Sequence, residues 1–208
     1  MSEGKGWMVP LTGAAFIVVA IIGFIVSGEP KDASHPANEI VDWYVDNKDS
    51  VEVGAFIGVA ATVLLVFFAA YLRNVLRAAA GGTDMLSLVS FIGVVVVAVG
   101  FAFDATISIA LAERADDIDP IAVQSLQALW DNDFVPIALG ILLFLWATGI
   151  SVLRSGALPK WIGWVMILFA VVALTPIGFV SFIATAILIL VISLLLAARA
   201  RSAGPATA

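Results

Sequence analysis

The stretch WIGWVMILFAVVALTPIGFVSFIATAILILVISLLLAA, residues 161–198, decides the fold class of this chain. It contains no charged side chain. As a single helix it would be about 57 Å long, whereas the hydrocarbon core of a bilayer is about 30 Å thick. Pro176 and Gly178 lie near its middle and favour a turn. The stretch therefore predicts two membrane helices, about 161–175 and 179–198, and one long kinked helix is the alternative.

Four more apolar segments precede this stretch, at about 8–27, 51–72, 85–112 and 134–153. The chain is 62% hydrophobic and 12% charged, with a mean hydropathy of +1.11, whereas soluble domains are about 25% charged. We predict an all-α, polytopic transmembrane helical bundle with six spans, forming a single domain over residues 1–208. The first apolar run is longer than that of a signal peptide, so we expect it to be retained as a span.

The composition also excludes several classes of chemistry. Asp and Glu number 16 against 10 Lys and Arg, so the chain offers no general basic surface to nucleic acid. It has no cysteine and one histidine, His35, which excludes disulfides, iron–sulfur clusters and thiolate zinc sites. No metal-ligand spacing or phosphate-binding loop is present. We therefore predict no catalytic, cofactor-binding or metal-binding residues and no cofactor.

Basic residues are distributed unevenly between the two sides that six spans would create. Cytoplasmic loops are enriched in Lys and Arg, so the side with more of them, which also carries both termini, is predicted to be cytoplasmic. We expect a multi-pass protein of the cell (cytoplasmic) membrane. The richer side holds Lys5, Arg73, Arg77, Arg154, Lys160, Arg199 and Arg201; the outer side holds Lys31, Lys48 and Arg114.

Two amphipathic segments lie on the predicted outer side, within residues 28–50 and 113–133. In each, apolar residues recur at helical spacing, and the segment ends in Asp-Asn. We predict two outer amphipathic helices that pack on the bundle and act either as a cap or as a lid over a cavity. The residues expected to make this contact are Ile40, Tyr44, Leu126 and Trp130.

Asp104 is the charged residue in the interior of a predicted span, whereas Glu52 stands at the very start of another. Asp104 lies about 28 Å along its helix and so near the outer boundary of the membrane. A carboxylate at membrane depth needs a partner, water or a proton. Ser108 lies one turn further on the same face. The candidate intramembrane polar site therefore consists of Asp104 and Ser108, with hydroxyls predicted at similar depth on other helices: Thr175, Ser181 and Thr185.

Small residues predict where helices approach closely. Gly54 and Gly58 stand four residues apart in the second apolar run. A second set of small residues follows one face of the third run: Ala98, Ala102, Thr106 and Ala110.

Three motifs carry a family resemblance. An acidic-aromatic segment, EIVDWYVDNKDS, precedes the second apolar run, which ends in Leu72-Arg73 and Leu76-Arg77; the sequence LPKWIGW, residues 158–164, opens the fifth run. In these the chain resembles an uncharacterised family of small bacterial six-helix integral membrane proteins, a domain of unknown function. The resemblance covers most of the chain. It implies topology and location, and it implies no catalytic residues.

Three functions remain open from the sequence. The scarcity of polar groups in the spans favours a non-enzymatic membrane protein: a scaffold, a sensor, or a protein that binds a lipid or small hydrophobe. The first alternative is a small transporter or proton-coupled permease that uses Asp104. The second is a membrane enzyme acting on lipid head groups at the outer face. The expected partners are the lipid bilayer, a lipid or small hydrophobic ligand, and a second copy of the chain in a homo-oligomer, but no nucleic acid.

Overall fold

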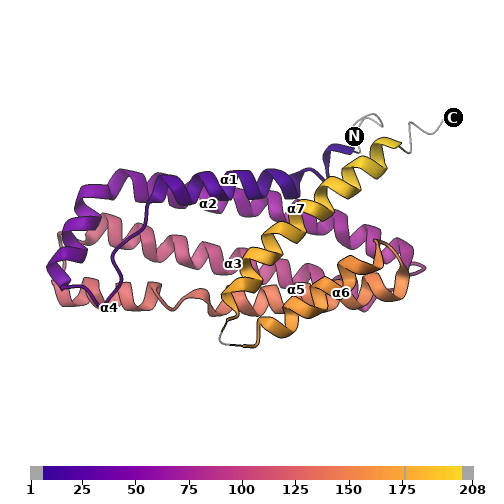
Figure 1. Ribbon diagram of the computed structural model, residues 1–208. Helices are drawn as coiled ribbons and strands as arrows, with labels where there is room; N and C mark the ends of the chain where they lie inside the picture. Colours follow the sequence, from indigo (N-terminus) through magenta and orange to yellow (C-terminus); the bar gives the residue numbers. More distant parts are fainter. Residues whose placement is uncertain (1–6, 176, 203–208) are drawn as a thin grey trace.

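The computed structural model describes residues 7–175 and 177–202, and these form a helical bundle without strands (Figure 1). The predicted all-α bundle is confirmed. Its helices are α1 (Thr12–Ser27), α2 (Ala37–Ala79), α3 (Met85–Arg114), α4 (Pro120–Trp130), α5 (Phe134–Ser155), α6 (Lys160–Val172) and α7 (Phe179–Ser202). The segment predicted to turn around Pro176 does leave the helical conformation on either side of that residue.

The first predicted amphipathic helix is not a separate element. It is helical, but it continues into the second apolar run as one 43-residue helix, α2. No Pro or Gly occurs between Ala37 and Val53, so nothing in the backbone ends the helix where the sequence becomes polar. The second predicted amphipathic helix is separate: α4 begins at Pro120 after the cap residue Asp119 and ends at Trp130.

Four helical stretches are long and apolar enough to cross a membrane: α2, α3, α7, and the stretch Pro120–Ser155 that contains α4 and α5. α1 and α6 are apolar but shorter, with 16 and 13 residues. Large apolar side chains also cover the outside of the bundle, among them Phe24 and Ile25, each 71% exposed. These properties identify a membrane protein.

Glycines bring the backbones of three helix pairs together. A Cβ on Gly23 of α1 would lie 3.1 Å from atoms of both Gly54 and Gly58 in α2. The prediction that Gly54 and Gly58 form a close-packing face is therefore confirmed. The other two pairs are Gly93 with Gly140, between α3 and α5, and Gly149 with Gly163, between α5 and α6.

The second predicted close-packing face is wrong. Ala102, Thr106 and Ala110 are exposed on the surface of α3. The face of α3 that packs closely is the one carrying Gly93 and Gly100, where added Cβ atoms would collide with α5. Glycine permits a closer approach than alanine or threonine, and the fold uses the glycines.

α7 crosses the bundle obliquely (Figure 1). It meets α1 near Ser193, whose hydroxyl donates to Pro10 O (2.6 Å) and accepts from Ala14 N–H (3.0 Å). From this junction α7 diverges from α1 toward its own first residue, Phe179 (Figure 1). The two helices therefore lie further apart in the middle of the bundle than at Ser193.

The end of the bundle that carries α4, called here the α4 end, has a hydrophobic cluster of its own. It joins the first part of α2, the last turns of α3, and α4. Ile40 and Tyr44 are 0% and 1% exposed, and Leu126 and Trp130 pack against this cluster. The predicted contact of the amphipathic segments with the bundle is thus confirmed. At the opposite end the first and last described turns meet, with the guanidinium of Arg201 4.0 Å from the ring centre of Trp7.

Candidate functional site

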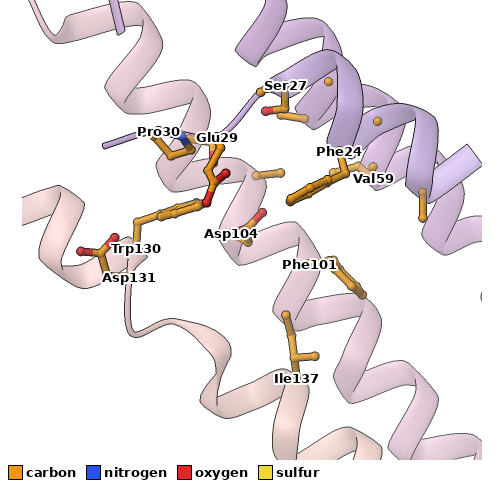
Figure 2. A pocket seen from close by; sticks show the side chains of 18 of the residues that line it. Phe24, Ser27, Glu29, Pro30, Val59, Phe101, Asp104, Trp130, Asp131 and Ile137 are labelled. Atoms are coloured by element: carbon orange, nitrogen blue, oxygen red, sulfur yellow. The ribbon is translucent and has the colours of Figure 1, made fainter. Parts of the chain in front are cut away.

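A cavity of about 470 Å³ lies between α1, α2 and α3, next to the α4 end (Figure 2). Its walls come from the last turns of α1, the Gly54–Gly58 face of α2, and the residues around Asp104 in α3. Trp130 of α4 and Ile137 of α5 complete it. The close approach of α1 and α2 through glycine leaves Gly58 facing open space, because a Cβ there would meet no atom within 4 Å.

Asp104 lines this cavity and is partly buried. One turn earlier, Gly100 packs against Ile137, which fixes this part of α3 against α5. The ion pairs of the described residues are Lys31–Glu39, His35–Asp32 and Arg114–Asp117. Asp104 takes part in none of them, so no cation of the described chain neutralises its carboxylate.

Ser108 also lines the cavity, one turn beyond Asp104, and is only 8% exposed. Within the described part of the chain, its hydroxyl makes no hydrogen bond. This is unusual here, because every other buried serine or threonine hydroxyl of the described chain is bonded; these are Thr62, Ser87, Ser90, Thr148, Ser151, Ser181, Thr185 and Ser193. Buried hydroxyls normally find a partner, so Ser108 offers the cavity an unused donor and acceptor.

Trp130 and Glu29 close the cavity toward the α4 end. Figure 2 shows the Trp130 ring and the carboxyl groups of Glu29 and Asp104 extending toward the same space. The indole Nε1 of Trp130 is buried and faces the Asp104 carboxylate, although it lies outside normal hydrogen-bond geometry. Glu29 is exposed.

A hydrogen-bond network holds the α1–α2 connection against α4. Asp131 Oδ2 accepts from Ala33 N–H (2.8 Å), and its Oδ1 accepts from Gln127 Nε2 (2.9 Å). Gln127 Oε1 in turn accepts from the buried Tyr44 hydroxyl (2.7 Å). Gln124 Nε2 donates to the carbonyls of Ala33 (3.0 Å) and His35 (2.9 Å). This network fixes the connection that carries Glu29 and the other residues of the cavity rim.

Ionisable groups at the α4 end have shifted pKa values. Burial, with a smaller effect of the Asp131 charge, raises the pKa of Tyr44, which precedes the apolar run of α2. Burial raises the pKa of Asp133, just before α5, to about 6. Hydrogen bonds from Ser34 lower the pKa of the exposed Asp32, and Lys31 lowers that of Glu39. Tyr44 therefore stays protonated and keeps donating to Gln127.

An apolar groove adjoins the cavity. A second cavity, of about 360 Å³, lies between α1, α3 and α7, where α1 and α7 diverge. The two cavities share part of their lining: Phe16, Ala20, Phe24, Phe101 and Phe182. The combined space thus has carboxylates at the α4 end and aromatic and aliphatic side chains along the rest.

The predicted polar site is only partly assembled. Asp104 and Ser108 share a cavity, whereas Ser181 and Thr175 line a separate pocket at the α6–α7 turn, and Thr185 lies in the apolar groove. Their hydroxyls bond to the backbone: Thr175 to Val172 O, Ser181 to Phe169 O and Thr185 to Ser181 O. The Thr185 bond is the within-helix type usual for serine and threonine in membrane helices, whereas the Ser181 bond joins α7 to α6 and Thr175 lies just after the end of α6.

Sequence reasoning did not identify three features of the site: Glu29, the cavity-facing side of Trp130, and the open face of Gly58. Glu29 reads as a solvated loop acid, and Trp130 as a contact of the amphipathic helix. The GxxxG spacing marks Gly58 as small but does not indicate what lies opposite it. In the described part of the chain, no group of three or more His, Asp or Glu side chains could hold a metal ion.

No family model, curated relative or solved structure matches the chain.

Proposed function

We propose that this membrane protein binds a lipid or other small amphiphile in the space formed by the cavity and the adjoining groove. The proposal includes six spans, with α1 and α6 as the two short ones, in a cell membrane with both termini cytoplasmic. In this proposal the protein binds its ligand without catalysing a reaction. The resemblance to six-helix membrane proteins of unknown function and the homo-oligomer remain predictions.

One observation carries the proposal: the cavity holds the Asp104 carboxylate, which has no cationic partner among the described residues, and the unbonded Ser108 hydroxyl, and it adjoins an apolar groove. An amphiphile has the same division, with a polar head and an apolar chain. Binding sites for small molecules are typically apolar cavities of some 300–1,000 Å³ with a few polar groups that set orientation. The cavity volume of about 470 Å³ lies within this range.

The divergence of α1 and α7 provides a route of entry. Groove residues such as Ile21 and Phe24 of α1 and Phe182 of α7 are also exposed on the outside of the bundle. In a bilayer, that outside faces acyl chains. A ligand could therefore move sideways from the lipid into the groove without crossing water.

The transport alternative requires a path from the cavity to the opposite end of the bundle. Between them the interior is filled by large side chains of α2 that are at most 1% exposed, namely Leu65, Phe68, Leu72 and Leu76. Binding needs no such path, and we therefore prefer it. The enzyme alternative would need a reactive group at the α4 end, and no observation favours one.

The proposed topology has a direct test. Reporter fusions after Ala208 and within residues 80–84 are expected to report a cytoplasmic location, and a fusion within residues 115–118 an external one. The reason is the excess of Lys and Arg on the predicted inner side. An external signal from the Ala208 fusion would reverse the orientation.

Filling the cavity at Gly58 is expected to block binding. Gly58 lines the cavity, and a Cβ added there would meet no atom within 4 Å. The side chain of Gly58→Phe is therefore expected to enter the cavity and occupy it. Photoactivatable C12 probes with an alcohol, amine or phosphate head, added to phosphatidylcholine nanodiscs, measure occupancy through labelling of groove peptides. We expect the labelling by the preferred probe to fall about tenfold, which corresponds to about 1.4 kcal/mol.

Val63→Phe is the matched control, because Val63 is on the same helix and 53% exposed to the surroundings of the bundle. It should leave groove labelling unchanged. Equal labelling of wild type and Gly58→Phe by all three probes would refute the proposed binding site.

A further inference from the structure

We infer that the polar end of this site recognises a primary ammonium group, so that the ligand is a long-chain amine. The inference rests on the proposed function and specifies its ligand. Its basis is the combination in one cavity of the Asp104 carboxylate, which no cation of the described residues neutralises, and the Ser108 hydroxyl, which makes no hydrogen bond within the described chain.

The negative charges around the cavity favour a ligand with a cationic head group. The acidic residues that line the cavity are Glu29, Asp32, Asp104 and Asp131, and no Lys, Arg or His is among the lining residues. Asp131 and Asp32 already accept hydrogen bonds from Gln127 and Ser34 and from backbone N–H groups. The nearby Lys31 is paired with Glu39 (2.6 Å). Asp104 and Glu29 are therefore left to attract a positive ligand, and a phosphate or carboxylate head would be repelled.

Ser108 provides the independent indication that a ligand binds here. A serine hydroxyl in a membrane helix usually bonds to the carbonyl of the preceding turn when it has no other partner. Thr106 does so on the same helix, donating to Ala102 O (2.8 Å). Ser108 is only 8% exposed and lines the cavity, yet its hydroxyl makes no hydrogen bond within the described chain. A ligand would supply the missing partner.

The spacing of the two residues defines the head group further. Asp104 and Ser108 are four residues apart on one face of α3. An ammonium group bound between them could donate one N–H to the carboxylate and another to Ser108 Oγ. A quaternary ammonium has the same charge but no N–H, and it would leave Ser108 unpaired. The aromatic ring of Trp130 beside the carboxylates also favours a cation.

The groove fits the rest of such a molecule. Phe101 of α3 and Phe182 of α7 line both the cavity and the groove and pack against each other, with their ring centres 6.3 Å apart. A chain attached to the head would lie along this pair. An amine-headed phospholipid would bring its phosphate next to the same carboxylates. A single-chain amine avoids that repulsion.

The test compares three photoactivatable probes with the same C12 chain in phosphatidylcholine nanodiscs: dodecylamine, its trimethylammonium analogue, and dodecanol. In wild type we expect dodecylamine to label the groove about tenfold more than either of the others. Asp104→Asn should reduce dodecylamine labelling about tenfold and leave dodecanol labelling unchanged, because it removes the charge that strengthens a hydrogen bond to an ammonium group. Ser108→Ala should remove the preference for dodecylamine over the trimethylammonium probe.

Glu113→Gln is the control for Asp104→Asn, since Glu113 is an exposed acid on the same helix and does not line the cavity. It should behave as wild type. A second competition, with phosphatidylethanolamine nanodiscs, separates the two sources of an amine head: strong competition by this lipid would overturn the assignment to a single-chain amine.

The outcomes distinguish the two proposals. Dodecylamine labelling that is unchanged in Asp104→Asn would overturn the ammonium inference, while Gly58-dependent labelling would still support the binding site. If no probe labels the groove of wild type, both fail. Should Asp104→Asn not fold, Ser108→Ala decides alone: an unaltered preference between the two cationic probes would contradict the inference.

Discussion

Gly140→Leu is expected to lower the free energy of unfolding by about 3 kcal/mol or more, or to prevent folding altogether. Gly140 lies where α5 touches α3 with no side chain between them. Even a Cβ at this position would lie 2.6 Å from Gly93 O and 2.7 Å from Val97 N. These are backbone atoms of a long helix, and they cannot move aside as a flexible side chain would. The two helices would have to separate along their contact.

Thermal unfolding in detergent measures this effect, and Gly58→Ala is its control. Gly58 is also a helical glycine, but a Cβ there meets nothing within 4 Å. Alanine should therefore be neutral or stabilise α2 by up to about 1 kcal/mol through the lower entropy of the unfolded chain. If Gly140→Leu unfolds at the temperature of wild type, the close α3–α5 contact does not exist in the protein.

Gln127→Leu is expected to have the second largest effect, by releasing the α1–α2 connection from α4. Gln127 is 0% exposed and links Tyr44 to Asp131. Leucine fills much of the same volume but leaves the Tyr44 hydroxyl buried without an acceptor, at a cost of about 1–3 kcal/mol. Asp131 loses one of its two donors as well. We expect hydrogen exchange in residues 28–36 and α4 to accelerate at least tenfold.

A second substitution shows whether the buried hydroxyl causes this loss. Tyr44→Phe combined with Gln127→Leu removes both members of the bond, and replacing both partners by apolar groups can be nearly neutral. The double variant should recover much of the protection that Gln127→Leu loses, a coupling that a double-mutant cycle measures. Exchange in the double variant as fast as in Gln127→Leu would show that the Tyr44–Gln127 bond is not what holds this end together.

The positions of the apolar helices could be predicted from the sequence because hydropathy and helix-breaking residues are local properties. The predicted run 85–112 corresponds to α3, 134–153 to α5 and 179–198 to α7. The same reliance on local properties explains why the sequence did not predict that the first amphipathic segment and the second apolar run form one helix, α2. A polar stretch resembles a loop, but without Pro or Gly it can continue a helix wherever its polar face meets water.

The site could be predicted in part. Asp104 stands out because a charge in an apolar run is costly, and Ser108 follows from helical periodicity. Thr175, Ser181 and Thr185 were placed with them by estimated depth along their helices. The depth of a residue along its helix does not tell which way its side chain points. On the oblique α7, Ser181 lines the pocket at the α6–α7 turn and Thr185 lines the groove.

The sequence by itself determined that this chain is an apolar helical bundle, where most of its helices lie, and that one carboxylate is set among apolar residues. Only the tertiary structure decided which faces meet. It joined Gly23 to Gly54 and Gly58, exposed the small residues Ala102 and Ala110, and brought Trp130 to the same cavity as Asp104. The physical reason is that hydropathy acts along one chain segment, whereas a cavity depends on the rotation and crossing of several helices, which their mutual packing sets.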